Sequence, residues 1–489
     1  MVYRVITVIF TVILMLFLFL PSAQALESIS DDTDLWDGKW TALAQRYPSP
    51  YISEEGLNAP DPELLAKWWI VFEDDLLTEL IGDALQKNRN LQSARAKVME
   101  ARASLGISKA ELLPWLDGVG SWTQTRNSTN AVGNEETNDV HRLGLDASWE
   151  IDIFGGKHAQ IQAAKSTLEA EHALLHDVWV TLASEVALNY LSLRTLQERL
   201  NIAEKNLALQ KDMLDLLRSQ LDSGLTDSLA LNQAQYTVEQ TRATIPPIRI
   251  SIEEMMNALA ILVGQTPGAL EMRLSEPKPL PNVDAVKLIG IPAEHLRRRP
   301  DIRAAERQLA AQLARKKVAE KDLLPRFRLI GSIGIESLSA GSLFSSDSYG
   351  FNFGPSITLP IFHGGAIRKN IKVQGARAEQ LLAAYEQTVL NAAAEVRNAL
   401  TANVQEIVRN DSLRLGIEAA RNALEVADDK YRNGLTDFNN VIGAQQALLS
   451  FEDQYVVSEG QKVSNVVQVF KALGGGWAPL ANWYATDVR

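Results

Sequence analysis

Few side chains in this sequence have the types and spacing that bind metal ions or perform catalysis. His172 and His176 lie four residues apart, so a helix would place both on one face, where they could ligate a metal ion. A zinc-protease helix carries a carboxylate between its histidines and this segment does not, so we favour an ordinary surface pair. The other histidines adjoin predicted turns or the region between the halves of the chain: His141, His158, His295 and His363.

Two further stretches have the composition of anion-binding sites. Gly474-Gly475-Gly476 follows an expected helix, whereas a phosphate loop follows a strand and continues with Gly-Lys-Ser or Gly-Lys-Thr, so we predict a helix stop. Arg297-Arg298-Arg299-Pro300-Asp301 could bind an anion, but we prefer the start of a helix carrying solvated charge. Because no nucleophile motif or acid pair appears, we predict a chain that is no enzyme and uses neither cofactor nor metal.

Apolar side chains at seven-residue spacing organise the elements that carry these residues. The first ladder consists of Val186, Leu193, Leu200, Leu207, Leu214 and Leu221, and the second of Leu413, Ile417, Ala420, Leu424, Ala427 and Tyr431. A strict seven-residue repeat is shorter than two turns of a straight α-helix, so such helices supercoil around their neighbours. Each ladder therefore predicts one arm of a long coiled-coil hairpin.

Both ladders end in nearly the same residues, Ser223-Gly224-Leu225-Thr226-Asp227 and Asn433-Gly434-Leu435-Thr436-Asp437. The glycine suits a helix end that needs positive φ, and Thr-Asp can cap the helix that follows. If the hairpins wall a tube, tip side chains would gather near its axis and could close it by hydrogen bonds and ion pairs. This candidate gate consists of Asp227, Tyr431, Arg432, Asp437, Asn439 and Asn440. Ordinary capping explains the two aspartates equally well, whereas Tyr431 at a ladder position favours a gate.

Composition narrows the class of protein. The chain has 489 residues, enough for two or three ordinary domains or one elongated assembly. Its net charge of -12 argues against binding nucleic acid and fits solubility or a lumen that prefers cations. It contains no cysteine, which excludes disulfides and thiolate metal sites and fits maturation in an oxidising compartment.

The first 25 residues have the pattern of a secretory signal peptide. Arg4 precedes an apolar run from Val5 to Leu20, and Pro21-Ser22-Ala23-Gln24-Ala25 provides a cleavage site before Leu26. An uncleaved anchor helix is the alternative, although the run barely reaches the ~18 apolar residues that span a bilayer. No Cys follows, so we expect no N-terminal lipid anchor. No other apolar run approaches spanning length, so membrane insertion would require β-strands.

Two segments, Leu143 to Ile153 and Phe351 to Ile361, alternate apolar and polar residues with the period of a β-strand. Leu116 to Thr125 and Phe327 to Ile335 are their expected partners. A soluble half-buried sheet would give the same alternation. The side chains expected to face lipid are Leu145, Ala147, Trp149, Ile151, Phe353, Ile357 and Leu359. Because four strands cannot close a barrel and open edges cannot sit in lipid, insertion would require several chains to pool strands.

The remaining segments are predicted to be helical. Trp68, Trp69 and Phe72 should pack a short helix. The long helices are expected at Leu76 to Leu113, Lys157 to Leu221, Ser228 to Gly264, Ala366 to Arg432 and Phe438 to Leu473. Pro246-Pro247 should interrupt or kink the third of these.

The two halves of the chain match at a constant spacing. Leu112-Leu113-Pro114 recurs as Leu323-Leu324-Pro325 (323 − 112 = 211), and Ala234-Gln235 recurs as Ala444-Gln445 (444 − 234 = 210). Such a period indicates a duplicated helix-strand-strand-helix-helix unit. We predict a signal peptide at 1–25, an extended segment at 26–60, a first repeat at 61–264, a proline-rich linker at 265–292, a second repeat at 293–475 and a tail at 476–489.

With these features together, the sequence resembles the TolC-like outer-membrane efflux proteins, particularly the branch that serves resistance-nodulation-division pumps. The likeness covers nearly all of the mature chain. Its most specific stretches are Trp68-Trp69 through Leu91, Ala94 to Ala101, Ile291-Pro292 through Glu306, and Leu323-Leu324-Pro325-Arg326.

The resemblance implies a membrane α+β fold with two repeats per chain. Three chains would form a twelve-stranded β-barrel in the outer membrane of a Gram-negative bacterium, continuous with a periplasmic α-helical coiled-coil barrel. This homotrimer would be a passive exit duct for substrates from an inner-membrane efflux pump and a periplasmic adaptor. By similarity, the residues that meet the adaptor are Gly224, Leu225, Thr226, Gly434, Leu435 and Thr436, and Tyr431 belongs to the closing network.

Two departures from the family pattern bear on this expectation. Many members are lipidated on an N-terminal Cys, absent here, so the barrel alone would attach the chain to outer-membrane lipid. Many also carry an acidic residue where this chain has Gly443, which argues against an acidic constriction, and Asn439 and Asn440 could provide a milder one. A non-conducting periplasmic coiled-coil scaffold and a type I secretion exit duct are the alternatives. A scaffold would not need apolar strand positions to face lipid.

Overall fold

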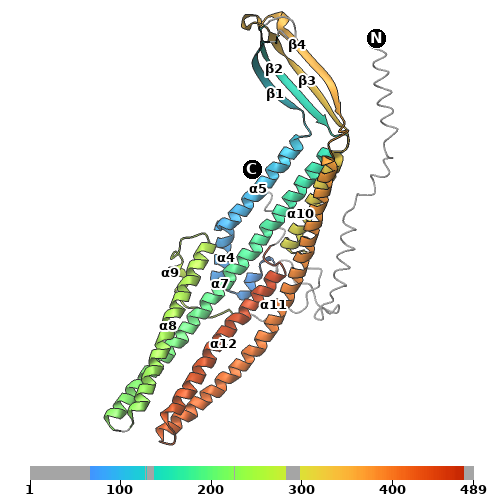
Figure 1. Ribbon diagram of the computed structural model, residues 1–489. Helices are drawn as coiled ribbons and strands as arrows, with labels where there is room; N and C mark the ends of the chain where they lie inside the picture. The colour runs from blue at the N-terminus through green and yellow to red at the C-terminus, as the bar shows by residue number, and fades with distance from the viewer. Residues whose placement is uncertain (1–65, 127, 129–136, 225, 282–297, 478–489) are drawn as a thin grey trace. The chain divides into compact units, whose positions relative to one another are not determined.

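The fold is taken from a computed structural model that describes residues 66–126, 128, 137–224, 226–281 and 298–477 (Figure 1). The predicted signal peptide, extended segment and most of the tail lie outside the described residues. Within the described ranges, no helix combines the length and the apolar content that crossing a bilayer requires.

Helices make up most of the described chain. They are η3 (Trp68–Phe72), α4 (Asp75–Lys87), α5 (Arg89–Ala110), α7 (Gly156–Asp222), α8 (Ser228–Leu262), α9 (Glu271–Leu274), α10 (Pro300–Lys321), η6 (Ala340–Ser342), η7 (Ser346–Ser348), α11 (Ala366–Arg432) and α12 (Phe438–Ala472). The strands are β1 (Trp115–Arg126), β2 (Thr137–Ile151), β3 (Arg326–Ser337) and β4 (Tyr349–Thr358).

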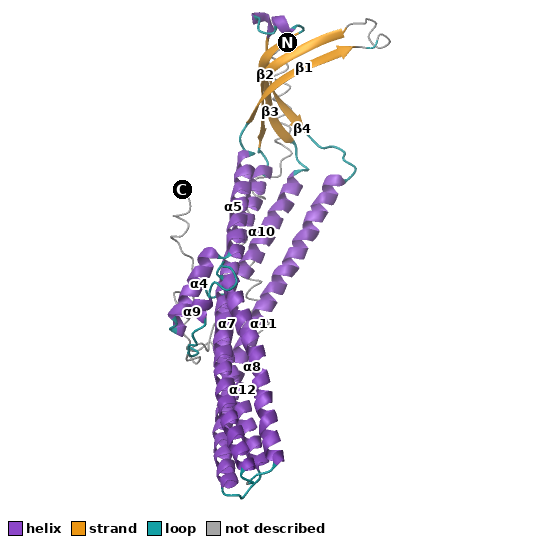
Figure 2. Ribbon diagram, turned by 90° about the vertical axis from the view of Figure 1, so that its left-hand side faces the viewer, coloured by secondary structure: helices purple, strands orange, loops and turns teal. Residues whose placement is uncertain are grey.

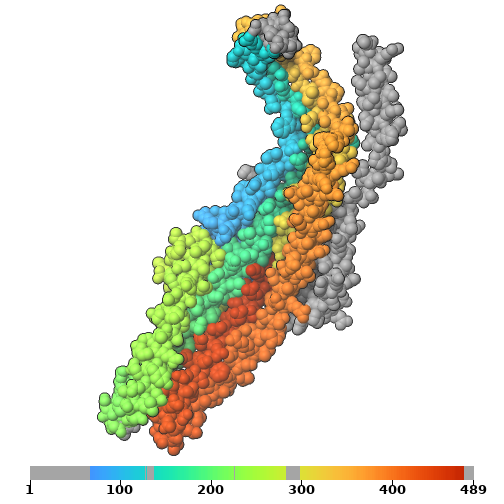
Figure 3. Space-filling model, in the orientation of Figure 1, coloured from blue at the N-terminus to red at the C-terminus, as the bar shows by residue number. Residues whose placement is uncertain are grey.

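Two helical hairpins form the long part of the fold (Figure 2). The helices α7 and α11 each have 67 residues, and their return helices α8 and α12 each have 35. Helix α12 packs against α7, so the hairpins lie against each other (Figure 3). The predicted ladders are confirmed, because Val186, Leu193, Leu207, Leu214, Leu413 and Ala420 are buried and the other ladder residues are partly buried.

An interruption or a kink was predicted in the return helix at Pro246-Pro247, and the interruption is wrong, because α8 continues through both prolines. A proline inside a helix removes one backbone hydrogen bond and crowds the preceding turn. Here Ile245 and Ile248, on either side, are buried in the same apolar cluster as Leu214 and Leu217 of α7. Packing therefore holds both flanks of α8 in helical geometry despite the lost bonds.

The helix predicted from Leu76 to Leu113 is two helices, α4 and α5, separated at Asn88. The extended backbone of Asn88 ends α4, and its side chain accepts a hydrogen bond from Leu91 N at 3.0 Å, which caps α5. The same side chain donates to Leu262 O, at the end of α8, at 2.9 Å. Asn is a favoured N-cap, and the contact with a distant helix end stabilises the break.

The largest buried apolar cluster lies where η3 and α4 pack on α7 and α12. The predicted short helix is a 3₁₀ turn whose Trp68 is fully buried and stacks on Phe470 of α12, with ring centroids 5.6 Å apart. Leu270 and Leu274, in or beside α9, belong to the same cluster. The described part of the predicted linker therefore packs into the core.

The four strands form one antiparallel sheet in the order β1-β2-β3-β4. Residues paired across neighbouring strands lie on the same face of the sheet. One such row runs across all four strands and consists of Leu116, Ala147, Gly331 and Phe353. The next row, Asp117, Asp146, Ser332 and Asn352, is polar. The sheet thus has one apolar and one polar face. The last strand ends before Leu359 and Pro360, earlier than predicted, because proline cannot donate to the ladder.

Candidate functional site

The hairpin tips have the backbone geometry that their sequence predicts. Gly224 and Gly434 adopt positive φ angles of 71° and 69°. Leu435 N donates to Lys430 O at 2.8 Å, and this closes the end of α11 in a Schellman-type turn. The Leu435 side chain is 75% exposed, so an apolar group projects from this tip. Leu225, its counterpart in the first tip, lies outside the described residues.

Three candidate gate residues make hydrogen bonds or ion pairs to residues close by in the chain. Asp227 caps α8 by accepting a hydrogen bond from Ala230 N at 2.9 Å, so the capping interpretation is confirmed for this residue. Asp437 stands at the N-cap of α12 without a side-chain capping bond to the described chain. Arg432 pairs with Asp428 one turn earlier at 2.8 Å, and Asn440 donates to the Thr436 hydroxyl at 2.6 Å. Asn439 is exposed.

Tyr431 connects the two hairpins. Its hydroxyl donates to Gln220 Oε1 of α7 at 3.3 Å, and its ring packs on Phe438 with centroids 5.3 Å apart. Sequence reasoning did not select Gln220. The sequence contained no signal for this contact, because the spacing of 211 residues (431 − 220) relates equivalent positions of the two halves and does not predict that they touch.

Further from the tips, an ion pair and an apolar cluster hold the hairpins together. Arg199 of α7 donates from Nε and Nη2 to the two carboxylate oxygens of Asp453 of α12, at 2.7 and 3.1 Å. Phe438, Val441 and Ile442 of α12 are buried in one cluster with leucines of α7. The sequence contained no signal for the ion pair, because its partners are 254 residues apart.

His172 and His176 are both partly buried, so the predicted surface pair is wrong for His176, which another ring covers. His176 stacks on Trp477, with ring centroids 4.8 Å apart and planes 16° apart, because the chain folds back after α12. Burial lowers the pKa of His176 to about 4, so the ring is neutral at pH 7. Across the described part of the chain, no three His, Cys, Asp or Glu side chains form a group able to hold a metal ion.

Helix α10 starts at Pro300, within the stretch predicted to begin a helix, and Arg297 lies outside the described residues. The predicted solvated charge is wrong for Arg299. Its side chain is buried and donates to Asp301, to Glu395 of α11 and to Ala472 O at the end of α12. Burial alone would lower the pKa of Arg299, but the hydrogen bonds to both carboxylates raise it. The predicted stop at Gly474 is confirmed, with φ of 70° and Gly475 N donating to Phe470 O at 2.8 Å.

The apolar face of the sheet is open to solvent in the single chain. Phe351 and Phe353 of β4 are 75% and 72% exposed, and Trp149 and Leu145 of β2 also project outwards. A soluble monomer rarely exposes a continuous apolar patch of this extent, which marks a surface that meets lipid or another chain. The residues predicted to face lipid lie on this face, except Leu359, which follows the end of β4.

The chain matches the family model described as outer membrane efflux protein twice, over residues 80–265 and 291–475. It is 31% identical over 431 residues to the cation efflux system protein CusC of Escherichia coli O6:H1, covering 87% of this chain and 92% of CusC. It is 31% identical over 450 residues to the pyoverdine export outer membrane protein OpmQ of Pseudomonas aeruginosa, covering 88% of this chain and 94% of OpmQ.

The toluene efflux pump outer membrane protein TtgI of Pseudomonas putida is 30% identical over 415 residues, covering 84% of this chain and 87% of TtgI. Among solved structures, the outer-membrane channel OprN superimposes with a TM-score of 0.81 at 33% identity, covering 88% of this chain and 95% of OprN. A CusC structure gives a TM-score of 0.78 at 28% identity, covering 88% and 97% of the two chains.

Proposed function

The chain belongs to the outer membrane efflux protein family, and from this membership we propose that it is the outer-membrane channel of a tripartite efflux system. It is a passive exit duct for compounds delivered by an inner-membrane pump through a periplasmic adaptor. The observation that carries this function is the sheet with one exposed apolar face and one polar face, joined to helices of 67 residues. A transmembrane strand needs this division between lipid and lumen.

Three chains supply the membrane part. The outer strands β1 and β4 each have one neighbour in the described sheet, so their other edges carry unpaired backbone groups that lipid cannot satisfy. Four strands from each of three chains give a closed barrel of twelve, with Ala147 and Phe353 toward lipid and Asp146 and Ser332 toward the lumen. The matched lengths of the two hairpins and the double family-model match support a duplicated unit.

The hairpin tips form the periplasmic gate and the adaptor contact. Opening the tube requires the α11–α12 hairpin to separate from α7–α8, which breaks the Tyr431–Gln220 hydrogen bond and the Arg199–Asp453 pair. The adaptor contacts an apolar surface that the exposed Leu435 and the tight glycine turns form. Asp437 and Asn439 are exposed and available for contacts between chains.

Planar-bilayer recording tests the gate. Replacing Tyr431 and Asp437 together by Ala should raise the single-channel conductance, because the link between the hairpins and an exposed tip charge are both removed. Tyr431→Phe removes only the hydroxyl and should give a smaller rise, which Gln220→Ala should reproduce. Tyr236→Phe, at an exposed tyrosine of α8, is the matched control. Unchanged conductance in the double variant would remove both residues from the gate.

The channel function has its own test. Purified mature protein should require detergent, sediment as a trimer and form conducting pores in planar bilayers. A protein that stays monomeric and dissolves without detergent would instead be a periplasmic scaffold. Relatives are named for cations, toluene and pyoverdine, so we assign the choice of exported compound chiefly to the pump.

A further inference from the structure

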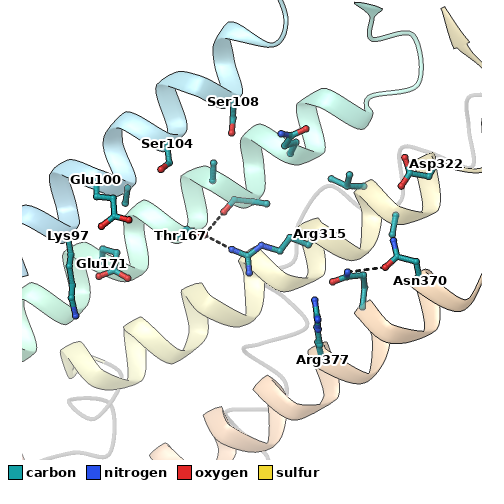
Figure 4. Close-up of a pocket in the computed structure, with 17 residues that line it drawn as sticks. Lys97, Glu100, Ser104, Ser108, Thr167, Glu171, Arg315, Asp322, Asn370 and Arg377 are labelled. Carbon is teal, nitrogen blue, oxygen red and sulfur yellow. Dashed lines mark hydrogen bonds between the residues drawn. The ribbon is translucent and has the colours of Figure 1, made fainter. Parts of the chain in front are cut away.

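A cavity of about 720 Å³ lies on the wall formed by α5, α7, α10 and α11 (Figure 4). Small-molecule sites commonly have volumes of ~300–1,000 Å³. The cavity shares Gln160, Val318 and Asp322 with a smaller one, which is also lined by Glu150 and Arg326. Glu150 lies in the polar rows of the sheet. The smaller cavity is also lined by Ile151 of the apolar rows, but the lining of the larger one is mostly polar, so we place the larger cavity on the lumen side under the proposed function.

Charges of opposite sign line the two sides of this cavity, which we call the wall pocket. Helices α5 and α7 provide Glu100 and Glu171, and helices α10 and α11 provide Arg315 and Arg377. Within the described chain, none of these four side chains takes part in an ion pair. Among the described residues, Arg315 donates a hydrogen bond to the Thr167 hydroxyl alone, at 3.3 Å.

The other lining residues give the wall pocket a neutral middle. Ala101, Ala163 and Ala319 are buried and form a small apolar floor. Lys97 stands on the acidic side without an ion pair among the described residues, and Asp322 on the basic side is neutralised by Arg326 at 2.6 Å. The charges left for a ligand are therefore two carboxylates and the ammonium group of Lys97 on α5 and α7, with a net negative charge, and guanidinium groups on α10 and α11.

We propose that the wall pocket binds amphoteric organic molecules in transit through the channel. The ligand's carboxylate lies on Arg315 and Arg377, its ammonium group lies on Glu100 and Glu171, and its apolar part covers the alanine floor. Guanidinium–carboxylate bonds are charge-assisted and directional, which favours this orientation. A ligand of one sign would engage only one side. The proposal rests on the proposed function for the placement of the pocket in the lumen.

Three fluorescent probes test this proposal: one carries both charges, and each of the other two lacks one of them. Nα-dansyl-lysine carries a carboxylate and an ammonium group, dansylcadaverine lacks the carboxylate, and dansyl-norleucine lacks the ammonium group. Their anisotropy is titrated with the purified channel in detergent. We expect dansyl-lysine to bind about tenfold more tightly than either single-charge probe, and its affinity to fall with added salt.

Variants assign the contacts. Arg377→Gln should weaken dansyl-lysine about fivefold and leave dansylcadaverine unchanged. Glu171→Gln should weaken dansyl-lysine similarly and leave dansyl-norleucine unchanged. Lys372→Gln, at an exposed position of α11 outside the pocket, is the matched control and should have no effect.

Equal affinity for the three probes would overturn the proposal. So would a loss of dansyl-lysine affinity in Lys372→Gln as large as the losses in Arg377→Gln and Glu171→Gln. Planar-bilayer recordings on the same preparation separate the two hypotheses. A protein that conducts but does not prefer dansyl-lysine refutes the wall pocket and leaves the channel function intact. A protein that binds the probe but does not conduct refutes the channel function.

Discussion

Removing the guanidinium group of Arg299 should destabilise the junction of three helices. The side chain is only 9% exposed. Its Nε and Nη2 donate to Asp301 at 3.0 and 2.8 Å, Nη2 donates to Glu395 at 2.7 Å, and Nη1 donates to Ala472 O at 2.7 Å. One residue therefore ties the start of α10 to the middle of α11 and the end of α12.

The expected cost of Arg299→Ala follows from what each partner loses. Breaking a buried ion pair by removing one partner costs ~3–5 kcal/mol. The Glu395 side chain is 58% exposed and can return to water, so its share is small. The Asp301 side chain is only 27% exposed, so it and the carbonyl of Ala472 would be left poorly solvated. Each lost hydrogen bond to such a group costs ~1–3 kcal/mol. We expect a total of about 3 kcal/mol, and roughly half for Arg299→Lys, which keeps the charge but not the forked geometry.

The assay is urea unfolding of the detergent-solubilised protein, followed by circular dichroism at 222 nm. Arg218→Ala is the matched control, because Arg218 pairs with Asp215 at 3.1 Å on an exposed surface and should contribute less than about 1 kcal/mol. If Arg299→Ala unfolds at the same urea concentration as Arg218→Ala, the junction does not depend on this cation.

Three further predictions address the sheet, the helix packing and a buried histidine. Ala147→Arg should disfavour assembly into lipid vesicles by ~2–4 kcal/mol, because it places a cation on the lipid face. Ser148→Arg, on the polar face, should assemble normally. The gel mobility of heated and unheated samples measures the assembled fraction of each variant. Gly460→Ala should lower the free energy of unfolding by ~1–3 kcal/mol, because the new Cβ would overlap a threonine of α7. Gly443→Ala is the control, because a Cβ there would meet open space. Equal urea midpoints for the two variants would contradict this prediction. Lowering the pH from 6.5 to 4 should destabilise the folded protein by up to about 3 kcal/mol through His176. The reason is that His176 takes up a proton in the unfolded chain at a higher pH than in the folded chain. His176→Gln should reduce this pH dependence of the free energy of unfolding.

Local patterns in the sequence were enough to predict most elements. The seven-residue ladders and the glycine turns predicted α7, α11 and α12 to within a residue or two, because supercoiled helices must keep one apolar stripe in line. Period-two alternation predicted two of the four strands, because a sheet with two different faces requires it, and the other two were predicted as their partners. Helix and strand periodicity, chain reversal and the two-sided character of the sheet are properties of adjacent residues.

Contacts between distant residues depended on the tertiary structure. The continuation of α8 through Pro246-Pro247 depends on packing against α7, and the burial of Arg299 depends on where α11 and α12 pass. The links Tyr431–Gln220 and Arg199–Asp453 join residues more than 200 positions apart. A side chain's type and spacing determine the element it sits in. Its partner, its burial and its pKa are determined by which elements pack together, because these depend on distances that only the folded chain sets.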